Sequence, residues 1–463
     1  MLGTLGAFIL LPAIICYIFS TMYLLPDYVF LFEPVNGLLG PAVFIGGIVL
    51  ATLIACRNEL VQTPVSLMRP KTPKAGSRVI LERIPFIWNR MSFLNKVTAR
   101  NLFRYKKRLL MTISGIAGCM ALLLFGFAIK DSVTDLVPRQ YEQTFFYDAM
   151  VVAADNDVLL GYLDRDPNVS EYLNGYITSV TLENADGKTE SAQLMVFEDG
   201  KNLQDYVELR HTDGEITTLE DGEVMVTQNA AILLEMESGD DAVVKTLQLE
   251  QADVVVTDVV QNYMSNYIYM TRATYEECFG EYEANGALVY ISEDCKDPVL
   301  FCDALAKQEG IMSCVSTDAM KDDFSTAFML INMVVYIVII MAACLAFVVL
   351  FTLATTNISE RIRELATIKV LGFYDNEVHA YVNKETMILT GIGILVGVPL
   401  GYAFAQTLTS ILSLPSMYLA VSLHPISYLI AGGLSLVFAL IVNMITDKSL
   451  DVINPVEALK SVE

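Results

Sequence analysis

The sequence predicts a multi-pass α-helical membrane protein with one α+β extracellular domain inserted between the third and fourth spans. Six apolar runs contain no Asp, Glu, Lys or Arg, and each is close to or above the length of about 20 residues that a spanning helix needs. Between the third and fourth runs, residues 131–325 hold 40 acidic and 10 basic side chains, whereas the whole chain of 463 residues carries a net charge of −23. An acidic soluble domain is therefore expected within a mildly basic, apolar remainder. This charge balance argues against nucleic-acid binding, which requires a basic surface.

The six predicted spans are Leu5–Leu25, Leu38–Ala55, Leu109–Ile129, Ala327–Thr356, Thr386–Leu408 and Pro425–Thr446. The first run lacks a basic start and a small-residue cleavage site, so it is interpreted as a retained helix and not as a signal peptide.

The loops predict how the spans are oriented. Arg57–Arg108 carries 13 basic residues against two acidic ones, which is typical of a cytoplasmic loop. Counting spans from this loop places both termini in the cytoplasm and residues 131–325 outside the cell membrane. Asp, Glu, Lys and Arg are also absent from the connection Thr409–His424, which the same topology places outside.

Two helices are expected to extend beyond the membrane. The third run continues past Lys130 with a helical stripe of apolar residues as far as Val137. The fourth run has 30 uncharged residues, or about 45 Å of helix against a hydrocarbon core of about 30 Å. Either the two helices form a stalk that carries the acidic domain, or the excess length is taken up by tilt.

The acidic domain shows alternating strand patterns and two helical segments. Tyr176–Leu182 and Thr189–Phe197 flank Asn184-Ala-Asp-Gly187, a hairpin signal. The other predicted strands are Glu223–Val226, a strand-rich stretch at Thr246–Val260, and Tyr267–Met270, and the predicted helices are Asn229–Glu237 and Pro298–Gly310.

A charged stretch, Asn357–Phe373, lies between the fourth and fifth apolar runs. Ile358, Ile362 and Leu365 recur at helical spacing, and charged residues occupy the other positions. Asn357 and a glutamate three residues later predict a capping box at the start of a helix, and Gly372 predicts its end. Such an amphipathic helix suits contact with a soluble partner, or simple anchoring of the spans at the lipid headgroups.

Asn357–Phe373, the following Glu377-Val378 and the glycine-spaced run after them resemble the FtsX-like (MacB-type) permease domain of ABC transporters. The resemblance implies that Asn357–Phe373 is a coupling helix that seats on a separate ABC ATPase subunit, a MacB/LolD-like ATP-binding protein that carries ATP-Mg. Cofactors are not expected in this chain itself. The implied partners also include membrane lipid and a dimer or pseudo-dimer of permease halves. The residues predicted to contact the ATPase are Asn357, Glu360, Arg361, Arg363, Glu364 and Lys369.

Glycines recur every fourth residue in the fifth run, at Gly393, Gly397 and Gly401. Small residues at this spacing let helix backbones approach closely. This pattern predicts packing against a neighbouring span, and it also suits a contact that slides during transport.

A weak internal repeat suggests the domain organisation. Leu60–Arg69 and Asp451–Lys460 share a Pro-Val pair and flanking residues, and each follows two apolar runs. We therefore expect either the C-terminal part of a longer two-half permease or a natural short form of one. Residues 1–69 would be the final two spans of a first half, 70–96 a cytoplasmic linker, 97–130 the first span of the second half, 131–325 the extracellular domain, and 326–463 the remaining three spans with the coupling helix.

The sequence lacks the motifs of several classes of functional site. It lacks the phosphate-cradling loop of ATPases, spacings typical of zinc ligands, and ionisable residues within the predicted spans. No catalytic, cofactor or metal site is expected. Cysteines at positions 278, 295, 302 and 314 cluster late in the acidic domain, and one or two disulfides or free thiols are both consistent with that.

Together with the resemblance, these patterns predict a permease subunit that exports or extracts an envelope-associated substrate, such as a peptide, a lipoprotein or a toxic compound. One alternative is a non-transporting signal module that regulates an extracellular wall hydrolase or a sensor kinase. Another is a membrane-anchored receptor domain without an ATPase partner.

Overall fold

The structure is a computed structural model that describes residues 34–60, 106–247, 250–411 and 417–451, with the separate positions 6, 12–17, 20, 89, 96 and 100. Most of the first predicted span, most of the linker 70–96, and the two repeat segments beyond Leu60 and Asp451 lie outside the described residues. The chain divides into two compact units: unit 1 comprises Met1–Ser114, Leu353–Leu389 and Asn443–Glu463, and unit 2 comprises Gly115–Thr352 and Thr390–Val442.

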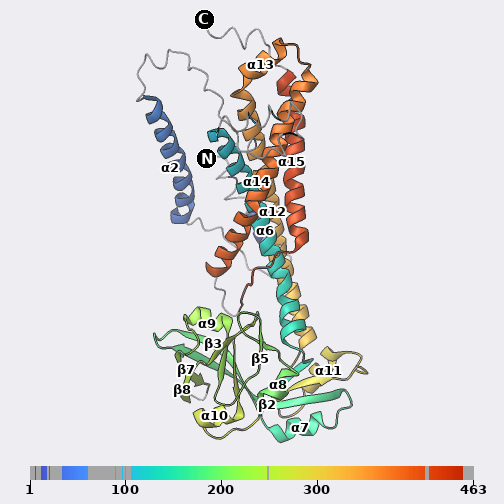
Figure 1. Cartoon of the computed structure of the whole chain (residues 1–463). Coiled ribbons are helices and arrows are strands. Elements are labelled where there is room, and N and C mark those ends of the chain that lie inside the picture. Colours follow the sequence, from blue (N-terminus) through green and yellow to red (C-terminus); the bar gives the residue numbers. More distant parts are fainter. Residues whose placement is uncertain are drawn as a thin grey trace. The chain divides into compact units, whose positions relative to one another are not determined.

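Long helices contain the last five predicted apolar runs (Figure 1). These helices are α2 (Pro34–Leu60), α6 (Lys106–Pro138), α12 (Thr317–Ser359), α14 (Asp375–Ile411) and α15 (Pro425–Asp451). Four segments within the described residues are long and apolar enough to cross a membrane: Leu109–Thr144, Thr317–Ser359, Asp375–Thr407 and Pro425–Lys448. The apolar part of α2, Leu38–Ile54, is shorter.

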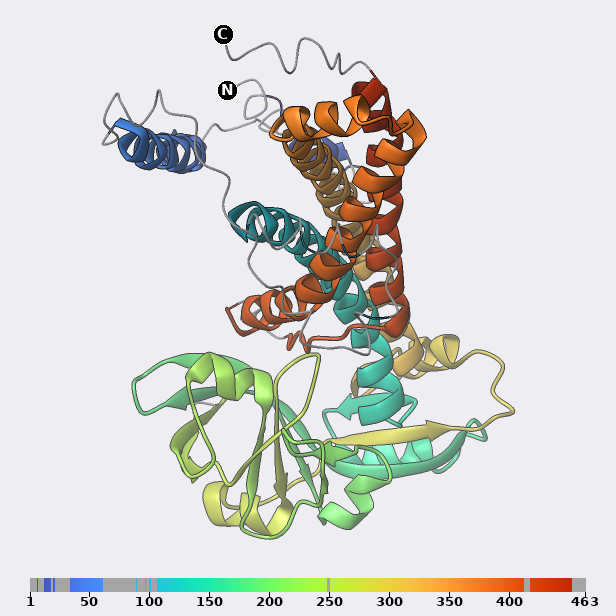
Figure 2. The same ribbon diagram turned by 45° about the horizontal axis from the view of Figure 1, so that its top comes forward.

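In unit 2, α6 and α12 run side by side into a sheet domain (Figures 1 and 2). Their close approach is explained by Gly126 of α6, since a Cβ atom there would lie 2.8 Å from Ile339 of α12. Beyond Lys130, α6 stays helical to Pro138 and continues as a π-helical turn, η2 (Arg139–Thr144). Val133 near the end of α6 and Phe328 in α12 are buried in one cluster with residues of the sheet domain. The predicted continuation of α6 past Lys130 is therefore confirmed, and α12 also extends beyond its apolar run, since it begins at Thr317.

The acidic segment forms a mixed ten-stranded sheet that lies in the sequence between α6 and α12. The order β12-β1-β11-β2-β3-β10-β6-β9 is mostly antiparallel, while β10 pairs with β3, and β6 with β9, in parallel; β7 pairs with β2 and β8. The strands are β1 (Ala149–Ala153), β2 (Val169–Asn184), β3 (Thr189–Phe197), β6 (Val224–Thr227), β7 (Asp241–Thr246), β8 (Gln251–Val255), β9 (Asp258–Val260), β10 (Tyr267–Thr271), β11 (Gly286–Ile291) and β12 (Ile311–Ser316). A separate pair comprises β4 (Leu209–Arg210) and β5 (Ile216–Thr217). The short helices are α7 (Asn156–Leu163), α8 (Gly200–Gln204), α9 (Gln228–Leu234), α10 (Arg272–Phe279) and α11 (Pro298–Leu305).

The predicted hairpin is present as β2 and β3. The Asn184 side chain accepts hydrogen bonds from the backbone N–H groups of Asp186 and Lys188 at 3.0 and 2.9 Å. Gly187 has φ +79°, a value that residues with a Cβ atom rarely adopt. Together these contacts close the turn and set the register of the two strands.

Other boundaries differ from the sequence prediction. β2 begins at Val169, seven residues earlier than predicted, because its first half pairs with β11. The first predicted helix ends at Leu234, because Glu235 takes a left-handed conformation with φ 53°. The second ends at Leu305 and not at Gly310. The fold class is otherwise confirmed: four apolar candidate spans accompany one domain of mixed sheet and short helices.

Candidate coupling site

The charged stretch Asn357–Phe373 is not one helix. α12 continues through Asn357 to Ser359, and a separate short helix, α13 (Ile362–Val370), follows it. The predicted capping box at Asn357 is therefore wrong. The amide group of Asn357 instead donates a hydrogen bond to the Thr112 hydroxyl at 3.4 Å. The predicted end is confirmed, since Gly372 has φ +96° and its N–H donates to the Lys369 carbonyl at 3.1 Å.

Arg361 stands at the break between the two helices, and its side chain points inward. The residue is only 5% exposed. Its guanidinium forms an ion pair with Glu385, donates to the Tyr381 hydroxyl at 2.9 Å, and donates to the Glu364 carboxylate at 3.1 Å. Because Tyr381 and Glu385 lie on α14, these contacts fix the start of α13 to that helix. The charge of Arg361, which the pattern placed on the polar side of an amphipathic helix, is instead matched inside unit 1.

Burial opposes the ionisation of Arg361, but the nearby Glu385 carboxylate raises its pKa above the ordinary value. The guanidinium also lies over the Tyr381 ring, 5.4 Å from its centroid. A buried charge is tolerated only when it has a partner and satisfied hydrogen bonds. Arg361 has both, so the pair holds the two helices in a defined geometry.

Lys369 fixes the other end of α13. Its ammonium donates to the Leu450 carbonyl in α15 at 2.9 Å and forms an ion pair with Asp375 of α14, also at 2.9 Å. Between the two ends, Leu365 and Ala366 are buried, and Leu365 belongs to an apolar cluster with Val378. α13 is thus attached to both α14 and α15.

The exposed surface of α13 differs from the predicted one. Ile362 is 37% exposed and does not join the buried stripe, because α13 starts its own helical phase after Arg361. Of the predicted contact residues, Glu360 and Arg363 are exposed, whereas Glu364 and Lys369 are half-buried. We define the outer face of α13 as the exposed charged and apolar residues of this helix and of the segments directly before and after it: Glu360, Ile362, Arg363, Val370, Leu371, Phe373 and Tyr374.

The sequence pattern did not predict the apolar end of this outer face. Leu371 is 72% exposed and Tyr374 is 78% exposed. The sequence feature that could have indicated it is the run of large apolar side chains at Val370–Tyr374, which Gly372 interrupts. This run lies beyond the apolar stripe of the helix.

Gly393, Gly397 and Gly401 of α14 lie against α6 in unit 2. A Cβ atom at Gly393 would lie 2.5 Å from Ile116, one at Gly397 would lie 2.6 Å from Met120, and one at Gly401 would lie 2.9 Å from Leu124. The absence of side chains at these three positions therefore permits the close approach of the two helices.

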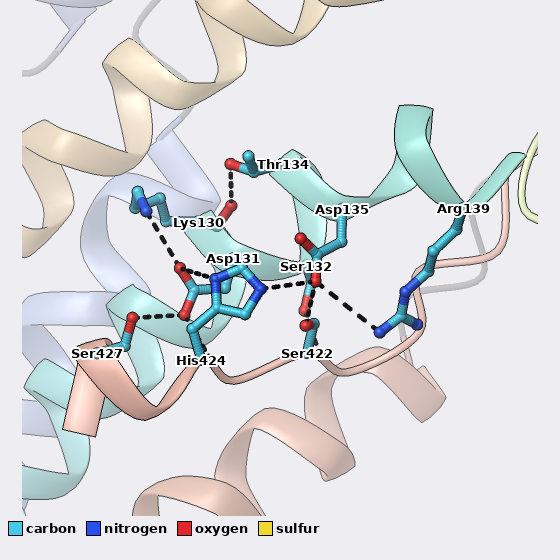
Figure 3. Close-up of polar contacts among 9 residues, drawn as sticks. All are labelled: Lys130, Asp131, Ser132, Thr134, Asp135, Arg139, Ser422, His424 and Ser427. Carbon is cyan, nitrogen blue, oxygen red and sulfur yellow. Dashed lines mark hydrogen bonds and ion pairs between the residues drawn. The ribbon is translucent and has the colours of Figure 1, made fainter. Parts of the chain in front are cut away.

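A polar cluster that the sequence did not predict joins α6 to the start of α15 (Figure 3). Asp131 is buried and accepts hydrogen bonds from the backbone N–H of His424 and from the Lys130 ammonium, each at 3.1 Å, and from the Ser427 hydroxyl. Because His424 and Ser427 lie at the N-terminus of α15, the carboxylate satisfies groups that a helix start leaves unpaired.

One turn further along α6, Asp135 contacts the same segment (Figure 3). Its carboxylate accepts a hydrogen bond from the Ser422 hydroxyl and lies 3.2 Å from Nε2 of His424. The backbone N–H of Ser422 donates to the Ser132 hydroxyl at 2.9 Å. We call residues 417–424, which precede α15, the outer strap.

The outer strap also contacts the sheet domain. The N–H of Tyr418 donates to the Tyr263 carbonyl at 3.0 Å, and Met417 forms a bridge with Met264. The buried Gln140 side chain of η2 accepts from the backbone N–H groups of Tyr263 and Met264 at 2.9 and 3.0 Å. Within unit 2, the strap therefore connects α6, α15 and the sheet domain.

Comparison with known proteins identifies the C-terminal part of the chain. Residues 336–446 match the FtsX-like permease C-terminal family. This range includes the second half of α12, all of α13 and α14, and most of α15. The resemblance to FtsX-like permeases is therefore confirmed over this range. No curated protein matches the sequence.

Three solved structures resemble parts of this chain. The periplasmic region of MacB from Actinobacillus actinomycetemcomitans is 12% identical, with 41% of this chain and 97% of that chain covered, and has a TM-score of 0.25. The extracellular domain of the noncanonic ABC-type transporter YknZ from Gram-positive bacteria is 15% identical, with 36% and 98% covered and a TM-score of 0.24. A permease-protein domain from Porphyromonas gingivalis is 11% identical, with 35% and 84% covered and a TM-score of 0.21.

Proposed function

We propose that this chain is the transmembrane permease subunit of an ABC-type transporter and that α13 receives force from a separate ATPase subunit. The FtsX-like permease C-terminal domain at residues 336–446 supports the membrane role. ATP and Mg²⁺ would be bound by the partner, and this chain would contribute no catalytic group of its own.

The attachment of α13 is the observation that carries this proposal. Arg361 ties its start to α14, and Lys369 ties its end to α14 and α15. A helix held at both ends moves together with the helices to which it is attached, whereas a loop would absorb a push by changing its conformation. The contacts therefore suit an element that passes displacement into the membrane helices.

The outer face of α13 is the proposed ATPase contact. Exposed aromatic and apolar side chains flanked by charged ones are typical of protein interfaces, where Tyr and Arg are enriched. Leu371 and Tyr374 would supply buried contact area, and Glu360 and Arg363 would supply polar contacts at the rim. Arg361 and Lys369 would position α13, with Glu364 as a partner of Arg361, and Asn357 would act within α12.

The sheet domain is the proposed site of action on the substrate. α12 begins at Thr317, directly after β12 of this domain, and ends at Ser359, directly before the turn into α13. One continuous helix thus joins the two regions in the sequence. We propose that residues 131–325 lie outside the cell membrane, that both termini are cytoplasmic, and that a peptide, lipoprotein or toxic compound of the cell envelope is exported or extracted. A dimer or pseudo-dimer of permease halves, embedded in lipid, would present two coupling elements.

The test is a double substitution on the outer face, Leu371→Glu with Tyr374→Glu, in the full chain produced in its native membrane. We expect loss of co-purified Mg²⁺-dependent ATP hydrolysis, because two carboxylates would be placed in an apolar contact. Leu247→Glu is the matched control, since Leu247 in the sheet domain is 74% exposed. If the double variant retained the ATPase activity of the control, α13 would not be the coupling site. ATP-dependent release of a labelled envelope compound separates transport from signalling.

A further inference from the structure

Two cysteine side chains meet in the sheet domain at the strand that precedes α12. Cys302 of α11 is buried and Cys314 of β12 is half-buried, and both pack into the apolar cluster formed with β1 and β11. A hydrogen bond joins their thiols. Cys295 packs at the edge of the same cluster, whereas Cys278 belongs to another one.

Each thiol is positioned by its own element. The Asp297 carboxylate caps α11 by accepting hydrogen bonds from the N–H groups of Val299 and Leu300 at 3.1 and 3.0 Å. This fixes the helix face on which Cys302 is buried. Cys314 lies opposite Val151 in the antiparallel pair of β12 and β1. The two sulfur atoms are therefore brought together by a capped helix and a paired strand, and not by the loop between them.

The hydrogen bond also has opposite effects on the pKa values of the two thiols. It lowers the pKa of Cys302, because the Cys314 thiol donates to the Cys302 sulfur, and it raises the pKa of Cys314 for the same reason. The thiolate is the reactive form of cysteine. A pair of adjacent sulfurs with one favoured thiolate is the arrangement that thiol–disulfide exchange requires.

We propose that Cys302 and Cys314 are a redox-active pair that forms a disulfide and thereby fastens β12 to α11. Its exposure to an oxidising compartment rests on the proposed topology, whereas the meeting of the two thiols does not. A disulfide of low molecular weight, or one carried by a thiol oxidoreductase, would be the oxidant.

The exchange proceeds in two steps. The half-exposed Cys314 attacks one sulfur of the oxidant as its proton passes along the hydrogen bond to the Cys302 sulfur, and the attack forms a mixed disulfide and releases the first thiol. The Cys302 thiolate then attacks the Cys314 sulfur, the bond to the oxidant breaks, and the second thiol is released. The two cysteine protons end on the two released thiols, so that two protein thiols are oxidised as one disulfide of the oxidant is reduced.

The position of the bond gives it a consequence for α12. β12 ends at Ser316, and Thr317, the first residue of α12, donates from its N–H to the Asp148 carbonyl and from its hydroxyl to the Tyr147 carbonyl, each at 2.8 Å. A covalent link at Cys314, three residues earlier, would strengthen the attachment of α12 to the sheet domain. Closing the loop 302–314 would also restrict the unfolded chain.

The experiment uses the purified full chain, incubated either with oxidised glutathione or with dithiothreitol, then denatured in acid, alkylated, digested and examined by mass spectrometry. We expect a Cys302–Cys314 linked peptide that has lost two hydrogens after oxidised glutathione, and alkylation of both residues after dithiothreitol. In Cys314→Ser the linked peptide should be absent, and in the control Cys278→Ser it should persist unchanged.

Alkylation of both residues after prolonged incubation with oxidised glutathione would overturn the proposal. A linked peptide between Cys302 and Cys295 would overturn it as well. Neither readout depends on ATP hydrolysis, so the disulfide and the coupling role of α13 can fail independently.

Discussion

Removal of the Arg361 guanidinium takes the cation away from a buried ion pair inside unit 1. In Arg361→Met, the buried Glu385 carboxylate loses its cation, and Tyr381 and Glu364 lose hydrogen-bond donors. Removing one partner of a buried ion pair costs about 3–5 kcal/mol. Since each 1.4 kcal/mol is a factor of ten in an equilibrium constant, local opening of α13 should increase roughly 100- to 4,000-fold.

Hydrogen–deuterium exchange of the full chain in detergent measures this opening at the α13 amides. The double variant Arg361→Met, Glu385→Met removes both charges, so we expect its exchange to return to within about tenfold of the unsubstituted chain, because apolar replacement of a whole buried pair is close to neutral. Lys384→Met removes an exposed cation next to Glu385 and should change exchange little. If the single variant exchanged like the unsubstituted chain, or if the double variant opened as readily as the single, the buried ion pair would not be what holds α13.

Two further predictions concern the helices of unit 2. Gly397→Ala should lower the melting temperature, because its Cβ would meet α6 at 2.6 Å and overpacking costs about 1–3 kcal/mol. Gly391→Ala is the control and should not lower it, because no atom lies within 4 Å of a Cβ at that position. Equal melting temperatures for the two variants would show that Gly397 does not set the close packing. Asp131→Asn should speed amide exchange at the start of α15 by roughly tenfold or more, because hydrogen bonds to charged groups contribute about 1.5–3 kcal/mol and the Ser427 hydroxyl loses a charged acceptor. The exposed Glu142→Gln is its control, and unchanged exchange in Asp131→Asn would show that the carboxylate does not hold that helix.

Features that depend on local pattern could be predicted from the sequence. Long runs without charges predicted the membrane-length helices, and Asn184 with Gly187 predicted the β2–β3 hairpin, because a span and a tight turn are each specified by neighbouring residues. The strands β1, β11 and β12 were missed, since each is a run of five or six residues without a distinctive turn beside it.

Features that depend on distant partners could not be predicted. Arg361 was placed on a polar face because its partners Tyr381 and Glu385 lie 20 and 24 residues later, on a helix whose position the pattern does not reveal. Asp131 and Ser427 are 296 residues apart, so no periodicity could indicate that they form one cluster. The periodicity also predicted a single helix across Asn357–Phe373, whereas the chain breaks at Arg361 between α12 and α13.

A photo-activated cross-linker at position 374 can capture the proposed contact between the outer face of α13 and an ATPase subunit. Irradiation of native membranes that contain the full chain should yield a covalent adduct with a protein that also binds a radiolabelled ATP analogue. The same cross-linker at position 247 should yield no such adduct. Absence of the adduct at position 374, or an equal yield at position 247, would contradict the account.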